Sequence, residues 1–258
     1  MLRFAALLLF FLLLFDNYGF AQTIINTEKL MSQDDSLAFS VEFNYSGNRG
    51  NAMTNKLDFA PNFINIGTKS DIKIFGAYSI LSAGEESIFY SAFIHGRHNY
   101  KFSERLKSFA FYQLQFNEVL LLQRRSLYGF GGRYGIINRD TLRFDLGVGS
   151  MYESELLDVT ALEPFEVAKT NFLRLSIFGS FHWETRNGIQ INNVIYYQPH
   201  FSNVKDFRLL VDYSLMFKVL EKLNFISTLT YRFDSDPPSA LRQYDLNINF
   251  GIRYSLSK

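Results

Sequence analysis

The segment HFSN, residues 200–203, has the residue types that come nearest to catalytic chemistry in this sequence. His200 could act as a general base, and Ser202 as the nucleophile that it activates. The third residue that orients such a histidine would have to be Asp212. Short motifs of this kind often mislead, so an ordinary surface loop is the alternative interpretation.

A second group of candidate residues is charged and alternates with apolar residues, so the two kinds lie on opposite faces of predicted strands. We predict that these charged residues form a network facing the inside of a barrel: Arg125, Arg133, Arg143, Asp145, Arg174, Arg208, Asp212, Arg232, Asp245 and Arg253. Mixed signs in a confined interior favour ion pairs over a wide funnel of one charge.

Histidine and glycine patterns argue against other sites. His95 and His98 lie three positions apart in a predicted strand, so they face opposite sides and cannot bind one ion together. The glycines of residues 129–135, GFGGRYG, lie inside a predicted strand and not at a strand-to-helix turn that would hold phosphate. We therefore predict no metal site and no cofactor.

The strands that would position these residues are predicted by strict alternation. In residues 243–256, QYDLNINFGIRYSL, apolar residues occupy every second position, which indicates a strand with two unlike faces. The pattern predicts 12 strands, at residues 37–45, 52–64, 71–81, 88–100, 107–116, 125–136, 142–152, 171–184, 189–198, 207–219, 224–234 and 243–256. Their lengths and even number fit tilted membrane strands.

The first residues predict export. Residues 1–21 combine Arg3 with an apolar run at residues 4–15 and small residues at Gly19 and Ala21, which is typical of a signal peptide cleaved after Ala21. A membrane anchor is the alternative, but the run is short for a bilayer span. We expect residues 22–36 to form a periplasmic lead and residues 37–258 a single barrel domain.

Alternation alone also fits a secreted soluble β protein. Three features favour lipid contact: the export signal, the lack of cysteine and of helical patterns, and glycines on the polar face at 129, 131, 135, 147, 149 and 251. We expect these glycines to leave room for long charged side chains in the lumen. The connections agree, because from the seventh strand onward they are alternately long (153–170, 199–206, 235–242) and short, as in outer-membrane barrels.

Several blocks are similar to one known family. Residues 37–59, 123–136 and 231–254 resemble the YdiY-like family of salt-induced outer-membrane proteins, in the form found in Bacteroidetes-type bacteria. The resemblance covers nearly the whole predicted mature chain and departs from the family at RYSLSK, where a terminal aromatic residue is usual. It implies an outer-membrane barrel of unknown biochemical activity.

These observations lead to two main functional hypotheses. The first is a closed, antiparallel, up-and-down transmembrane β-barrel of about 12 strands in the outer membrane of a Gram-negative bacterium. It would be non-enzymatic, with a structural, envelope-stress or narrow small-solute channel role. The second is an outer-membrane phospholipase or lipid A deacylase, because such enzymes carry a similar His-x-Ser-Asn. In those enzymes the pair faces the bilayer, whereas here strand parity puts His200 and Ser202 on the lumen side.

Partners follow from the first hypothesis. We expect contact with outer-membrane lipid, insertion by the outer-membrane assembly machinery, and a small solute of unknown identity. The net charge of +1 gives no reason to expect nucleic acid as a partner.

Overall fold

The structure, a computed structural model, describes residues 37–48, 54–83, 87–220 and 223–254. The predicted signal peptide (1–21) and lead (22–36) lie outside the described residues. Within these ranges the chain is all-β apart from two short 3₁₀ helices, η1 (Glu118–Leu120) and η2 (Val159–Ala161). Among the described residues, no helix is long and apolar enough to cross a membrane.

The 12 predicted strands are confirmed, and they form one sheet in sequence order. They are β1 (Leu37–Asn48), β2 (Thr54–Ile66), β3 (Ser70–Ala83), β4 (Ser87–Lys101), β5 (Leu106–Asn117), β6 (Leu122–Arg139), β7 (Leu142–Leu157), β8 (Lys169–Glu184), β9 (Gln190–Pro199), β10 (Phe207–Leu220), β11 (Leu223–Asp234) and β12 (Tyr244–Tyr254). Every neighbouring pair is antiparallel. The topology is therefore the up-and-down one that alternation predicted.

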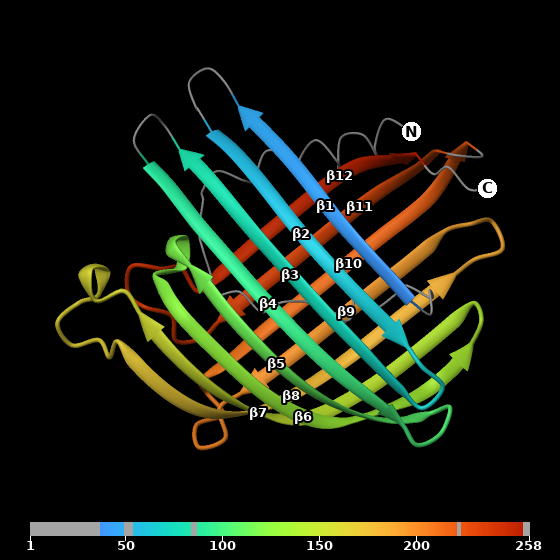
Figure 1. Ribbon diagram of the computed structural model, residues 1–258, viewed down its shortest axis with the longest axis horizontal. Coiled ribbons are helices and arrows are strands. Elements are labelled where there is room, and N and C mark those ends of the chain that lie inside the picture. Colours follow the sequence, from blue (N-terminus) through green and yellow to red (C-terminus); the bar gives the residue numbers. More distant parts are fainter. Residues whose placement is uncertain (1–36, 49–53, 84–86, 221–222, 255–258) are drawn as a thin grey trace, which may run out of the picture.

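The sheet is rolled up. Figure 1 shows β1–β4 as a front wall, β9–β12 as a back wall, and β5–β8 curving between them. Hydrogen-bonded pairing runs from β1 to β12, and in the described part of the chain no ladder joins β12 to β1. The rolled sheet fits the barrel class, but the closure that was predicted between the first and last strands, β1 and β12, is not seen among the described residues.

The two faces of the sheet have opposite chemistry. Outward-facing Phe39, Phe130 and Phe250 are 72%, 69% and 66% exposed, while inward-facing Arg125 and Glu153 are only 2% and 1% exposed. An exposed apolar surface around a charged interior is the reverse of a water-soluble protein and is typical of a membrane β-barrel.

Most strand boundaries differ from the predicted ones by one to five residues, and two of these differences affect the charged interior. Residues 117–124 and 153–170 were expected to be connections, but β6 begins at Leu122 and β7 continues to Leu157. The extension of β7 preserves its alternation, because Glu153 and Glu155 face inward on the same side as Met151. At the start of β6 a register shift lies between Leu122 and Arg124. Because of this register shift, the neighbours Gln123 and Arg124 are both exposed. Arg124 therefore lies within β6 and not in a loop.

The connections divide into two sets. Residues 158–168, 200–206 and 235–243 connect strands at one end, which we call the outer end; the turns at residues 67–69, 102–105, 140–141 and 185–189 lie at the other, inner end. The longer set on one side confirms the length pattern expected from the seventh strand onward, and the β7–β8 loop with η2 extends farthest to the left in Figure 1.

Candidate functional site

The interior near the outer end holds a group of buried ion pairs. We call it the outer network, and it consists of Arg125, Glu153, Glu155, Arg174, Asp206, Arg208 and Asp234. These residues come from β6, β7, β8, β10, β11 and the β9–β10 loop. Each of them is no more than 9% exposed.

Arg208 connects most of the outer network. Its Nε donates to Asp234 Oδ2 at 2.8 Å, its Nη1 contacts Glu153 Oε2, and its Nη2 lies 3.5 Å from Glu155 Oε2. Arg125 Nε donates to the same Glu155 oxygen at 2.7 Å. One guanidinium therefore joins carboxylates from two strands that lie on opposite sides of β8 and β9.

Arg174 of β8 connects Asp206 and Glu153 within the outer network. Its Nη1 and Nη2 donate to the two oxygens of Asp206 at 2.9 and 3.3 Å, and its Nε lies 3.4 Å from Glu153 Oε1. The fork of an arginine matched to both oxygens of a carboxylate is a strong, directional contact. Glu153 thus lies between Arg174 and Arg208, one arginine for each of its oxygens.

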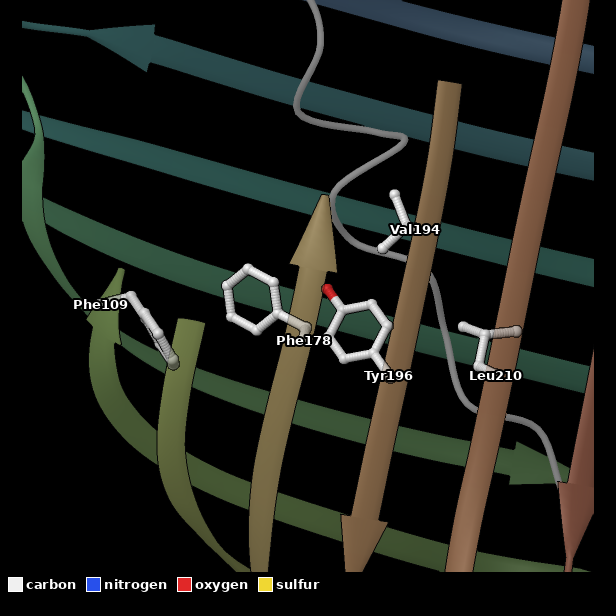
Figure 2. Packing of buried hydrophobic residues seen from close by; sticks show 5 residues of the cluster. All are labelled: Phe109, Phe178, Val194, Tyr196 and Leu210. Carbon is white, nitrogen blue, oxygen red and sulfur yellow. The ribbon is translucent and has the colours of Figure 1, made fainter. Parts of the chain in front are cut away.

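A chain of aromatic rings crosses the lumen on the inner side of the outer network. We call it the aromatic belt: Phe75, His95, Phe111, Phe109, Phe178 and Tyr196, with successive ring centroids 6.4, 5.4, 6.4, 5.9 and 5.3 Å apart. Figure 2 shows Phe109, Phe178 and Tyr196 pointing into one space together with Val194 and Leu210. These rings fill the middle of the lumen with apolar side chains.

The glycines of β6 and β7 make room for this belt. A Cβ on Gly129 would lie 2.2 Å from the Phe111 ring, and one on Gly147 would lie 2.2 Å from the Phe178 ring. We predicted that the glycines accommodate charged side chains; at these two positions the neighbours are aromatic instead, because Phe109, Phe111 and Phe178 bend over the strands between them. A Cβ on Gly135 would instead lie 3.2 Å from a charged group, Asp145 Oδ1, and Gly251 lies outside the residues whose surroundings are described.

Little space remains between the aromatic belt and the outer network. A cavity of about 40 Å³ there is lined by residues of both groups, among them His95, Arg97, Glu153 and Arg208. A space of this size holds a few water molecules. A second cavity of about 220 Å³ lies toward the outer end, between β2–β4, η1 and Asp245. In the described part of the chain, the larger of these two cavities therefore lies beside β2–β4 and the smaller one between the aromatic belt and the outer network.

The other residues predicted to form one charged network lie in separate places. Arg133 Nη2 donates to Asp145 Oδ2 at 2.7 Å in the inner half, and Arg232 lies 3.7 Å from Asp245 near the outer end. Asp212 is buried and accepts a hydrogen bond of 3.5 Å from Thr230 Oγ1. Arg143 is half-buried opposite His182 of β8. Arg253 pairs with Asn224 along the backbone, and its side chain lies outside the described residues.

Three acidic members of the outer network were missed from the sequence. Glu153 and Glu155 were assigned to a loop because β7 was ended too early, and Asp206 was read as part of the next connection. The signal for the two glutamates was present, since both continue the inward parity of Asp145 and Met151. Asp206 carried no such signal, because parity does not apply in a loop.

The structure does not bring His200, Ser202 and Asp212 together. The half-buried His200 ring packs edge-on against Phe172, with centroids 4.7 Å apart, while Ser202 is exposed in the β9–β10 loop. The backbone of His200 pairs with Asp206, and Asp212 lies six residues farther along β10, or roughly 20 Å away. Asp212 therefore cannot orient this histidine.

Two outer loops are tied together by one carboxylate. Glu166 Oε1 in the β7–β8 loop accepts hydrogen bonds from Ser239 N at 2.6 Å and Ser239 Oγ at 2.9 Å in the β11–β12 loop. Glu166 Oε2 accepts from Glu163 N at 2.8 Å. The hydrogen bond from the Ser239 backbone, followed by that from Glu163, lowers the pKa of Glu166 below its ordinary value.

This contact predicts acid-sensitive loops. Because the pKa of Glu166 is lowered in the folded state, the contact stabilises the loops above the ordinary glutamate pKa, and protonation releases it as the pH falls below that value and through the lowered pKa. Spin labels on Val167→Cys and Ala240→Cys, in a chain without native cysteine, should give a narrow distance distribution at neutral pH and a broad one in acid. Glu166→Gln should be broad at both pH values, whereas the control Glu163→Gln should behave as the parent; a narrow Glu166→Gln distribution would contradict the contact.

In the described part of the chain, no group of three or more histidine, cysteine, aspartate or glutamate side chains is placed to hold a metal ion. The candidate site is the lumen itself, with the outer network toward the outer end, the aromatic belt next to it and the Arg133–Asp145 pair in the inner half.

Comparison with known proteins gives one family. The family model described as Protein of unknown function, DUF481, matches residues 41–256. No curated protein matches the chain.

Several solved structures show weak overall similarity. A KdgM porin in complex with disordered oligogalacturonate is 10% identical, with 84% of this chain and 100% of that chain covered and a TM-score of 0.45. The siderophore receptor PirA from Pseudomonas aeruginosa is 13% identical over 87% of this chain and 47% of that chain, with a TM-score of 0.42. The β domain of the Bordetella autotransporter BrkA is 11% identical over 86% and 100%, with a TM-score of 0.40.

Proposed function

The chain belongs to the family described as Protein of unknown function, DUF481, and since that description leaves the activity open, we propose a function from the lumen itself. The protein is a non-enzymatic outer-membrane β-barrel that passes small solutes through a narrow lumen. Its apolar outer face contacts outer-membrane lipid, and the outer-membrane assembly machinery inserts it. The narrower assignment to YdiY-like proteins of Bacteroidetes-type bacteria belongs to the same proposal.

The observation that carries this proposal is the layered interior. The outer network and the aromatic belt enclose a cavity of about 40 Å³, and a cavity of about 220 Å³ lies nearer the outer end. Charged and aromatic side chains at a constriction are the usual means by which a pore selects what enters it. A lipid hydrolase is supported less well, because Asp212 lies roughly 20 Å from His200 and cannot orient it.

Conductance across a planar bilayer tests the proposal. The parent protein should give small, discrete current steps, and the Phe109→Ala/Phe178→Ala variant should raise the step size by about twofold or more, because those rings fill the middle of the lumen. The matched control is Phe130→Ala, which removes a ring that is 69% exposed on the outer face of β6 and should leave the current unchanged. If neither the parent nor the double variant conducts, the proposed passage is wrong.

A further inference from the structure

We propose that the cavity of about 40 Å³ between the aromatic belt and the outer network binds uncharged, hydroxyl-bearing solutes of the linear polyol class. In this site Nε2 of His95 accepts a hydrogen bond from a hydroxyl of the solute. The inference rests on the proposed function and gives it a substrate class, because the cavity lies on the proposed solute path.

The hydrogen bonds around His95 show which of its ring nitrogens carries the proton. Gln113 Nε2 donates to Gln115 Oε1 at 3.4 Å, which leaves the amide oxygen of Gln113 for His95. His95 Nδ1 lies 3.1 Å from that oxygen, and since an amide oxygen can only accept, Nδ1 is the donor. In the neutral ring the other nitrogen, Nε2, is therefore an acceptor.

This Nε2 is a buried acceptor to which no group in the described part of the chain donates. His95 is 2% exposed, and it is one of the residues that line the cavity. Buried polar atoms are normally hydrogen-bonded, either within the protein or to a bound molecule. We therefore expect the donor to belong to a molecule in the cavity.

The charged side chains around the cavity favour an uncharged occupant. Arg125, Glu153 and Arg208 take part in the ion pairs of the outer network, and Arg97 Nε donates to Asn99 Oδ1 at 3.0 Å. A charged solute would have to compete with these contacts or be buried without a partner, and an unpaired buried charge is costly. A hydroxyl is buried at little cost once it is hydrogen-bonded.

The type of donor also follows from Nε2. A carboxylate has no proton to donate to it, and an ammonium group would bring a charge into the cavity. A hydroxyl donates without a charge, and its oxygen can accept from another neutral group. Ser176 and Gln198 are two such groups in the lining of the cavity.

The remaining lining suits the carbon chain of a polyol. Phe111, Leu127 and Met151 line the cavity, and the Phe111 ring stacks on His95 with centroids 5.4 Å apart. Sites for small molecules are usually of this kind, mainly apolar with a few polar groups that fix the orientation. A space for a few water molecules is narrow, so we expect it to take a linear polyol end-on.

Swelling of proteoliposomes in isotonic erythritol, an uncharged four-carbon polyol, tests the role of His95 in passage. His95→Phe keeps a ring in the aromatic belt but removes the acceptor, so the swelling rate should fall by about three- to tenfold. The potassium chloride conductance of this variant should stay close to that of the parent. His95→Gln, which restores an acceptor, should recover much of the swelling rate.

The matched control is His98→Phe, the same substitution at an exposed position of the outer face, three residues farther along β4. It should keep the swelling rate of the parent. If His95→Phe lowered swelling and conductance equally, the packing of the ring and not its acceptor would explain the effect, and the proposed hydrogen bond would be wrong.

Nitrogen-15 NMR of histidine-labelled protein in detergent separates the polyol site from the passage. The chain has four histidines, and the signals of His95 are those that His95→Phe removes; His95→Gln assigns them if the phenylalanine variant does not fold. The parent should show a ring protonated on Nδ1, and erythritol should shift its Nε2 signal saturably. Erythronate, which has a carboxylate in place of one terminal hydroxymethyl group, should leave that signal unchanged.

The two measurements together distinguish the failure of each proposal. A saturable shift without swelling would support the polyol site and refute the passage. Swelling of the parent without a shift would refute the polyol site and retain the passage. A ring protonated on Nε2, or an equal shift with erythronate, would overturn the uncharged hydroxyl as the occupant.

Discussion

Replacing Arg208 by methionine is expected to lower the free energy of unfolding by about 3 kcal/mol, because breaking a buried ion pair leaves an uncompensated charge. Arg208 is 5% exposed, and its main partners Glu153 and Asp234 are each 1% exposed. Glu153 keeps Arg174 and Glu155 keeps Arg125. Among the described residues, however, Asp234 would keep only the hydrogen bond that its Oδ1 accepts from Asp236 N.

The matched control for this prediction is Arg232→Met. Arg232 is an arginine on the neighbouring strand β11, but its side chain and that of Asp245 are 23% and 30% exposed and their atoms are 3.7 Å apart. An ion pair of that kind contributes about 1 kcal/mol or less. Urea unfolding in detergent, followed by the mobility difference between the folded and unfolded bands, measures both variants. Equal losses for Arg208→Met and Arg232→Met would contradict the central place of Arg208.

A compensating substitution tests the cause of the loss. Arg208→Met/Asp234→Asn replaces the orphaned carboxylate with a neutral amide, so it should recover a substantial part of the stability lost by Arg208→Met. Asp234→Asn alone should be destabilising, since it breaks the same pair from the other side. If the double variant lost as much free energy of unfolding as the two single variants together, lost packing and not the unpaired charge would explain the effect of Arg208→Met.

Side-chain alternation was enough to predict the strands and their faces. Parity predicts the 12 strands, and it predicts that Arg125, Arg174 and Arg208 face inward. In a strand that separates lipid from a polar lumen, the two faces differ so strongly that the side on which each residue lies is well determined. Parity gives the face of a residue but not its height in the barrel. Strands of a rolled sheet are tilted and staggered, so the meeting of Arg208 on β10 with Glu153 on β7 required the three-dimensional structure.

The aromatic belt shows a second limit of pattern reading. Phe109 and Phe111 share the inward parity of Lys107 and Gln113, so the sequence predicts that both rings face the lumen. It does not predict which side chains the two rings contact there. Residue type suggested that the lumen would be charged throughout, and only the packing of Phe109 against Phe178, with ring centroids 5.9 Å apart, shows an apolar layer across it. The prediction for Gly129 and Gly147 was wrong for the same reason. The rings that lie against these glycines, Phe111 and Phe178, belong to other strands and are distant in the sequence.

Replacing Gly131 by alanine should destabilise the barrel by about 1–3 kcal/mol or prevent its folding, because the added methyl group would overlap neighbouring atoms. Its Cβ would lie 2.4 Å from the backbone oxygen of Val148 and 2.6 Å from the Cα of Gly149. Gly131 and Gly149 are direct partners across β6 and β7, so relief would require the two strands to part. The Phe109 ring, 2.5 Å from the same position, would also have to leave the aromatic belt.

The neighbouring residue supplies the control. Gly132 follows Gly131 on β6 but faces the other side of the sheet, and the nearest atom to a Cβ there is Lys107 O at 4.0 Å. Gly132→Ala should therefore be neutral or stabilise by a few tenths of a kcal/mol to about 1 kcal/mol, through the reduced freedom of the unfolded chain. Both variants have the same composition change in the same strand, so a difference in urea midpoint reports the space on the two faces alone. If Gly132→Ala were the more damaging change, the close approach of β6 and β7 beneath Phe109 would be wrong, and with it the constriction of the lumen at the aromatic belt.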